Sequence, residues 1–211
     1  MTDTLESEPA AAAEIFGDHL ERGRRFTTAL ARHGEELGLI GPLELPRLWT
    51  RHILNSALVA PLLRPGTVGD VGSGAGLPGL VLAIMRPDVS FTLIEPMERR
   101  VTWLERQAAE LELSNVTVVR ARAEESKLNG KLDQVTARAV SALRTLIPVT
   151  APLLRPSGEL VLMKGAGVDN EITAAEKAIR KYRLRDAEVL VLGEGLVPES
   201  EVTRVFRATV G

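Results

Sequence analysis

The sequence contains no cysteine and only three histidines among its 211 residues. Disulfide bonds, thiolate metal sites and a catalytic thiol are therefore excluded. His19, His33 and His52 lie far apart and lack the spacing typical of zinc ligands. We therefore expect neither a metal site nor cysteine-based chemistry.

Aromatic residues and long apolar runs are also scarce. Aromatic residues make up 3% of the chain, which argues against a stacking platform for single-stranded nucleic acid. No apolar run reaches the ~20 residues needed to cross a bilayer, and the acidic start MTDTLESEP does not resemble a secretory signal. These absences predict a cytoplasmic protein without membrane contact.

Neither sign of charge is in excess, since 26 basic residues stand against 28 acidic ones. Strongly basic domains are typical of nucleic-acid binding, and this composition argues mildly against that role. If the protein binds a nucleic acid, it must therefore do so through a local basic face or with the help of a partner protein.

Two helical segments precede the first predicted strand. Residues 10–37 have the periodicity of helices, glycine and proline interrupt the pattern between 38 and 46, and a second amphipathic segment covers 48–63. We predict that residues 1–64 form a helical extension.

From residue 67 onward, strand and helix patterns alternate. Strands are predicted at 67–71, 90–95, 115–121, 132–139, 158–165, 187–192 and 201–210. This alternation predicts one compact α/β unit over residues 65–211, with a seven-stranded, mostly parallel sheet. Only a loop separates the last two strands, so we expect a hairpin and an antiparallel C-terminal strand.

The stretch DVGSGAGLPG, Asp70 to Gly79, lies where the first predicted strand passes into a helix. Counted from Gly74, it matches G-x-G-x-x-G, the dinucleotide fingerprint, which favours an NAD(P)-dependent oxidoreductase. Counted from Asp70, it is an acidic residue followed by three alternating glycines. An acidic side chain repels a pyrophosphate but can receive the ammonium group of S-adenosylmethionine, which has no phosphate.

Acidic residues also follow the next two predicted strands. Glu95 is suited to ribose hydroxyls in either ligand, whereas Glu124, beside Ala123, is placed to meet an adenine amino group. The C-terminal hairpin also favours the methyl donor, because dinucleotide-binding halves normally continue with helical crossovers. Taken singly, the glycines are equally typical of a plain turn, and Glu95 and Glu124 are more typical of solvated or surface carboxylates than of ligand contacts.

Several motifs together resemble one family. The family is that of the glucose-inhibited division protein B, the bacterial 16S rRNA (guanine-N7)-methyltransferases, and the similar motifs are RHILNSALVAP (51–61), DVGSGAGLPGLVLAI (70–84), ARAEE (121–125), TARAVSAL (136–143) and LMKG (162–165). The resemblance runs from about Trp49 to the C-terminus. Before it, this chain has GLIGPLE where many members carry Asn-Leu-Thr.

The resemblance implies a class I methyltransferase fold that uses S-adenosylmethionine. The cofactor contacts that it implies are Gly72, Leu77, Ala123, Glu124 and Arg138. The glycine turn adds Asp70 and Gly74 to this set, and fold geometry adds Glu95 for the ribose.

Basic residues provide candidates for contact with RNA phosphates, namely Arg51, His52, Arg138 and Lys164. Arg138 ends the fourth predicted strand, and its structural alternative is an ion pair with Glu124 or Glu95. His52 has its own structural alternative, that of a helix residue satisfied by packing or a hydrogen bond.

Guanine N7 has an exposed lone pair in the neutral base, so its methylation requires alignment and no deprotonation. We therefore predict no dedicated catalytic base. The absence of cysteine excludes the usual route to pyrimidine C5, and TARAVSAL replaces the Asn/Asp-Pro-Pro-aromatic motif typical of amino methylation. The predicted function is N7 methylation of a guanine in 16S rRNA, free or within the small ribosomal subunit, by a monomer. An oxidoreductase and a non-catalytic ribosome-binding protein are the alternatives.

Overall fold

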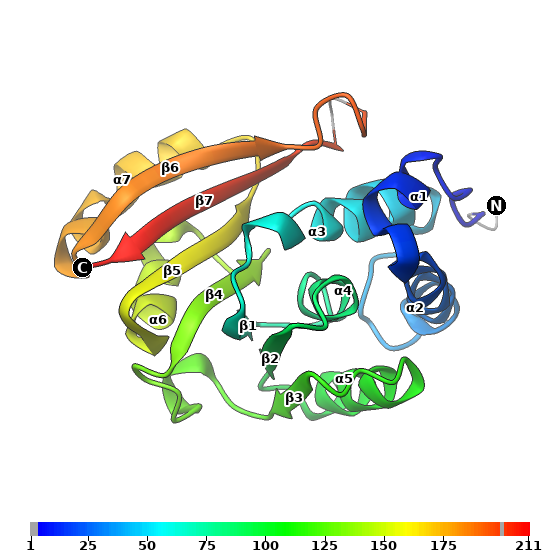
Figure 1. Ribbon diagram of the computed structural model, residues 1–211, viewed down its shortest axis with the longest axis horizontal. Coiled ribbons are helices and arrows are strands. Elements are labelled where there is room, and N and C mark those ends of the chain that lie inside the picture. Colours follow the sequence, from blue (N-terminus) through cyan, green and yellow to red (C-terminus); the bar gives the residue numbers. More distant parts are fainter. Residues whose placement is uncertain (1–3, 199–200) are drawn as a thin grey trace.

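One sheet of seven strands runs through the computed structural model, which describes residues 4–198 and 201–211 (Figure 1). The strand order is β3-β2-β1-β4-β5-β7-β6. The strands are β1 (Gly66–Val71), β2 (Val89–Ile94), β3 (Val116–Val119), β4 (Leu132–Arg138), β5 (Leu154–Lys164), β6 (Leu184–Leu192) and β7 (Thr203–Val210). The predicted strands are therefore confirmed, with shifts at their ends.

The C-terminal strand β7 lies between β5 and β6 and is antiparallel to both, whereas the pairs among β1 to β5 are parallel. The predicted hairpin and antiparallel strand are confirmed. At the centre of the sheet, β1 has β2 on one side and β4 on the other. Ligands of such sheets bind beyond the carboxyl ends of the strands at this point, where the strand order reverses.

Helices cover both faces of the sheet (Figure 1). They are α4 (Gly79–Met85) and α5 (Glu98–Glu110) on one face, and α6 (Leu143–Thr150) and α7 (Val168–Lys181) on the other. Neighbouring residues of β5 serve the two layers: Val161 belongs to the core beneath α4 and α5, and Leu162 to the core beneath α6 and α7. The stretch of β5 that is buried on both faces, residues 160–163, is therefore apolar without interruption, as in other parallel sheets.

The N-terminal part is helical, as predicted, but apart from α2, with 14 residues, its helices are short. They are α1 (Ala11–Phe16), η1 (Gly17–His19), α2 (Leu20–His33), η2 (Leu45–Arg47), the π-helix η3 (Leu48–Leu54), α3 (Asn55–Ala57) and η4 (Ala60–Leu62). Two further 3₁₀ turns are η5 (Ala123–Glu125) and η6 (Ala151–Leu153). Gly17 ends α1 because it adopts a φ of +49°, outside the helical region.

The N-terminal helices lie on the same side of the sheet as α4 and α5 (Figure 1). Their buried side chains Phe26, Leu30 and Ile53 belong to the same core cluster as those of α4. The division of the chain into 1–64 and 65–211 stays a prediction, and residues 1–3 of the first part lie outside the described residues.

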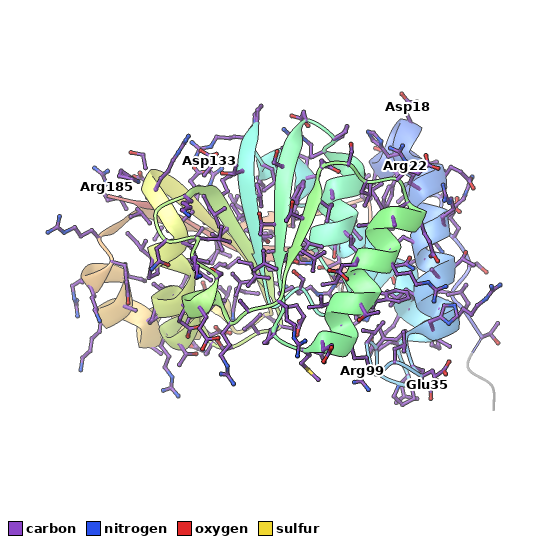
Figure 2. All side chains as sticks on the ribbon, turned by 90° about the horizontal axis from the view of Figure 1, so that it is seen from below. Asp18, Arg22, Glu35, Arg99, Asp133 and Arg185 are labelled. Atoms are coloured by element: carbon purple, nitrogen blue, oxygen red, sulfur yellow. The ribbon has the colours of Figure 1, made fainter. Side chains whose placement is uncertain are left out.

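Figure 2 marks the two sides of the sheet at which the parallel strands begin and end, here called its amino and carboxyl edges. Asp133, near the start of β4, lies at the edge where the parallel strands begin, and Arg99, near the start of α5, lies at the edge where they end. Glu35, just after α2, lies at this second edge as well. The segment that follows α2 therefore reaches the carboxyl ends of the strands. Among the described residues, no helix has the length and apolar character needed to cross a membrane.

Candidate active site

The glycine turn follows β1 and has a backbone that other residues rarely adopt. Gly72, Gly74 and Gly76 have φ values of +71°, +53° and +93°, in the region that only glycine enters at little cost. A Cβ atom at Gly72 would lie 2.8 Å from Cγ2 of Val140, which follows β4. The turn therefore brings bare backbone close to the end of the neighbouring strand.

Asp70 lies beneath this turn, and its side chain is completely buried. Its Oδ2 accepts a hydrogen bond from the backbone N–H of Gly79 at 3.1 Å, whereas its Oδ1 has no hydrogen-bond partner. Burial raises the pKa of this carboxyl to about 7, with the charge of Glu95 acting in the same direction and the hydrogen bond from Gly79 opposing it. A buried carboxyl with one unpartnered oxygen favours a cationic group nearby.

Glu95 is also buried and closes on the turn from the end of β2. Its Oε2 accepts the backbone N–H of Gly74 at 3.0 Å, and its Oε1 accepts that of Met97 at 3.0 Å. The guanidinium of Arg100 lies 3.9 Å from Oε2. Each of its oxygens can accept a second hydrogen bond, so ribose hydroxyls can bind while both amides stay in place.

These contacts distinguish between the two predicted ligands. A pyrophosphate binds at such a turn through free backbone N–H groups. Here carboxylates already accept the N–H groups of Gly74 and Gly79, and the carbonyl of Ser73 accepts that of Gly76 at 2.7 Å. The turn therefore fits a cationic ligand without phosphate, and the oxidoreductase alternative loses its structural basis.

Two cavities open at the carboxyl edge of the sheet. The first, here called the turn cavity, has a volume of about 330 Å³ and is lined by the glycine turn, by residues 39–41 after α2 and by Arg138. The second, here called the strand-end cavity, has a volume of about 570 Å³ and lies beyond the ends of β4 and β5. Arg138 and Ala139 line both cavities, so they form the wall between them.

Arg138 points from the end of β4 toward the helical segment 51–56. It donates hydrogen bonds to Nδ1 of His52 at 2.6 Å, to the carbonyls of Arg51 and His52 at 3.2 and 3.3 Å, and to the hydroxyl of Ser56 at 3.4 Å. The alternative ion pair with Glu124 or Glu95 is therefore wrong. Burial and the nearby Arg51 lower the pKa of Arg138 to about 10, so it stays charged at neutral pH.

The other predicted cofactor contacts separate into two groups. Gly72, Gly74 and Leu77 line the turn cavity together with Arg138. Ala123 and Glu124 lie in η5, after β3, where Ala123 is buried and Glu124 is exposed. The two groups come from different strand ends of the same edge, as the sequence predicts.

The side chains predicted to contact phosphates differ in their exposure and in their protein partners. Arg51 is exposed and lines the strand-end cavity. The side chain of Lys164 is only 8% exposed, and its Nζ lies 2.7 Å from Glu171 and donates to the carbonyl of Ser141 at 2.8 Å. His52 is 13% exposed, with both ring nitrogens engaged by protein groups. Of these three, Arg51 is the one that presents its charge to solvent.

Sequence reasoning missed the contribution of the segment after α2. Leu39, Ile40, Gly41 and Glu44 line the turn cavity, and Oε2 of Glu44 lies 2.5 Å from Nε2 of His52. These residues belong to GLIGPLE, where the chain departs from the family pattern, so no motif marked them. In residues 4–198 and 201–211, no group of three or more His, Cys, Asp or Glu side chains is arranged to hold a metal ion.

Proteins similar to this chain cover almost its whole length. The family model that matches, over residues 19–200, is described as GidB, rRNA small subunit methyltransferase G. A ribosomal RNA small subunit methyltransferase G from Leifsonia xyli is 71% identical over 210 residues, covering 100% of both chains. Another, from Clavibacter michiganensis, is 66% identical and covers 98% of this chain and 97% of its own. A solved structure of a SAM-dependent methyltransferase from Aquifex aeolicus shares the fold, with a TM-score of 0.58, 17% identity, and coverage of 80% of this chain and 95% of its own.

Proposed function

Because this chain belongs to the family of rRNA small subunit methyltransferase G, we propose that it transfers a methyl group from S-adenosylmethionine to N7 of a guanine in 16S rRNA. The predicted class I methyltransferase fold is confirmed. One observation carries the proposal for the site: two cavities adjoin at the carboxyl edge, one on the glycine turn and one beyond β4 and β5. A donor and an acceptor in these cavities would meet at their shared border, which Arg138 and Ala139 line.

The turn cavity is the site proposed for the methyl donor. S-adenosylmethionine supplies a methyl group carried by a positively charged sulfur. Gly72, Gly74 and Leu77 give this cavity a wall with little side-chain obstruction. Asp70 and Glu95 place carboxyl groups under and beside the turn, which suits a ligand with an ammonium and a sulfonium. Ala123 and Glu124 remain the proposed contacts for adenine.

The protein's task in this reaction is alignment. Guanine N7 is a nucleophile in the neutral base, so the bond from N7 to the methyl carbon forms as the sulfur–methyl bond breaks, and no proton has to move. A positive charge passes to the guanine. Glu201 lines the strand-end cavity and provides negative charge near the methylated base, whereas Glu171, on the same lining, is paired with Lys164.

The remaining parts of the proposal concern the partner and the assembly. We place 16S rRNA, free or in the small subunit, against the strand-end cavity with Arg51 near a phosphate. Acting on rRNA implies a cytoplasmic enzyme, and we propose that it acts as a monomer. Size-exclusion chromatography with light scattering at working concentrations measures this: a mass of 22.8 kDa supports the monomer, and twice that mass contradicts it.

The direct test uses methyl-labelled S-adenosylmethionine with small subunits and naked 16S rRNA that lack the modification. We expect label on one guanine, located at N7 by mass spectrometry of nuclease fragments. Subunits that bind the protein without becoming labelled would support the non-catalytic alternative instead.

A matched pair of glycine variants tests the donor site within the same assay. Gly72 and Gly130 have φ values of +71° and +68°, but a Cβ at Gly72 meets Val140 whereas one at Gly130 meets nothing within 4 Å. Alanine should therefore strain the backbone similarly at both positions, by about 1 kcal/mol. We expect Gly72→Ala to weaken S-adenosylhomocysteine binding at least tenfold and Gly130→Ala to leave it unchanged. Equal affinities in the two variants would contradict this donor site.

A further inference from the structure

Arg138 stands where the two proposed substrates meet, since it lines both the turn cavity and the strand-end cavity. A guanidinium in such a wall acts on the reaction only if its position is fixed. Flexible arginine side chains are costly to order, so the contacts that hold Arg138 determine whether the wall is formed before the substrates bind.

Uncharged groups hold this guanidinium. Its shortest hydrogen bond, at 2.6 Å, goes to Nδ1 of His52, and its other acceptors are two backbone carbonyls and the hydroxyl of Ser56. Because none of these acceptors is a carboxylate, the positive charge of Arg138 is left uncompensated by its direct partners. It therefore remains available to a ligand in either cavity.

The ring of His52 is fixed from its other side by Glu44. An arginine can only donate, so Nδ1 of His52 must be unprotonated and Nε2 must carry the hydrogen that Glu44 accepts. Burial lowers the pKa of His52 to about 4, with Arg138 and Arg51 acting in the same direction and Glu44 opposing them. The ring is therefore neutral near pH 7, in the one tautomer that serves both neighbours.

We propose that Glu44 and His52 are positioning residues for Arg138. Glu44 fixes the orientation of the His52 ring, and His52 then holds the Arg138 guanidinium at the border between the two cavities. This inference rests on the proposed function, and it assigns the segment after α2 a role in methyl transfer. His52 is then a support for the site instead of the phosphate contact that the sequence suggested.

Two conservative variants of His52 separate its two contacts. The side-chain oxygen of asparagine can replace Nδ1 as an acceptor for Arg138, whereas the amide of glutamine can replace Nε2 as a donor to Glu44. We expect His52→Gln to lower the single-turnover methylation rate at saturating donor and rRNA by about a hundredfold, the cost of a misplaced group near reacting atoms. His52→Asn should recover most of that rate.

Controls separate positioning from folding. Arg106 donates to Glu110 at 2.7 Å on α5, outside both cavities, so Arg106→Ala should leave the rate near that of the wild type. Unfolding midpoints of all variants are measured alongside. Equal losses in His52→Asn and His52→Gln, or an Arg138→Ala variant with the wild-type rate, would overturn the proposal.

A spectroscopic readout keeps this inference apart from the proposed function. Long-range ¹H–¹⁵N spectra of the three histidine rings report the tautomer of His52 without any substrate. The charged groups that face this ring are Glu44, Arg51 and Arg138. We expect the Nε2–H tautomer at pH 7 in the wild type, and a mixture of the two neutral tautomers in the double variant Glu44→Ala/Arg138→Ala, in which neither ring nitrogen keeps its partner. A ring that carries its proton on Nδ1 would refute the positioning role. A wild-type enzyme that has the Nε2–H tautomer but methylates no rRNA would refute the proposed function alone.

Discussion

Asp70 illustrates how a single residue can be held out of its ordinary ionisation range. Its carboxyl is completely buried beneath the glycine turn and keeps one oxygen without a partner. Burial raises its pKa to about 7 from a usual value of 3.8, so the folded protein binds a proton there that the unfolded chain has already released. A bound cation near this carboxyl would favour its charged form instead.

Stability should therefore depend on pH through Asp70. Between about pH 4 and 7 the folded state binds more protons than the unfolded one, so the stability that this group contributes is present in acid and lost as pH rises. Asp70→Asn should gain stability relative to the wild type on going from pH 5 to pH 8, by at least the ~1.4 kcal/mol that one pKa unit represents. Urea unfolding at the two pH values measures this, and a constant difference between the proteins would contradict it.

At the scale of elements, side-chain hydrogen bonds connect the helical segment formed by η3 and α3 to the end of one strand and the start of another. Arg138 connects it to the end of β4. Asn55 connects it to the start of β7: its side chain donates to the carbonyl of Glu201 at 2.9 Å, and its own carbonyl accepts from Thr203 at 2.9 Å. The segment thus fixes two borders of the strand-end cavity.

Loss of the Asn55 side chain should loosen the start of β7. Asn55→Ala leaves the Glu201 carbonyl without this donor, and we expect a loss of about 1 kcal/mol of stability. Hydrogen exchange of residues 201–204 should accelerate as well. Asn129→Ala, at an exposed position in another turn, is the matched control and should change neither quantity. Unchanged exchange in the Asn55 variant would contradict the fastening role.

At the scale of the whole molecule, a near-neutral protein must bind a polyanion through one edge. The net charge is −2, yet Arg51, Arg138 and Arg204 gather on the lining of the strand-end cavity. Arg22 lies near the opposite edge of the sheet, beside Asp18 (Figure 2). Binding of rRNA is therefore expected to depend on the position of an arginine more than on the total charge.

Salt dependence of rRNA binding measures this asymmetry. Each phosphate contact contributes about 0.7 to 0.9 to the slope of log affinity against log salt concentration. Arg204→Gln should lower the slope by about that amount and weaken binding, whereas Arg22→Gln, with the same change of charge, should leave the slope unchanged. Equal slopes for the two variants would show that overall charge dominates.

The sequence predicts the strands and the glycine turn well because both depend on local patterns. Short runs rich in apolar and β-branched residues mark β1 to β7, and the glycines of Asp70 to Gly79 can be recognised by spacing alone. The position of β7 between β5 and β6 depends on pairing between distant residues, which local periodicity does not encode.

The support of Arg138 was beyond prediction for a similar reason. His52 and Arg138 are 86 residues apart, and Glu44 reaches His52 across a turn and a π-helix. Lys164 looked free in sequence, but folding places Glu171 at 2.7 Å from its ammonium. A basic side chain that pairs with a residue distant in sequence is no longer free to bind a ligand, even where its position in a motif suggests that it is.

The segment Leu39 to Glu44 has a consequence for what counts as the smallest working enzyme. It comes from the helical N-terminal part, yet it forms a wall of the turn cavity. A chain that began at β1 would keep the glycines of the donor site and lose the roof over them. The sheet and the helical N-terminal part therefore both form the pocket, and recombination that exchanged the first sixty-four residues with those of a relative would replace part of it.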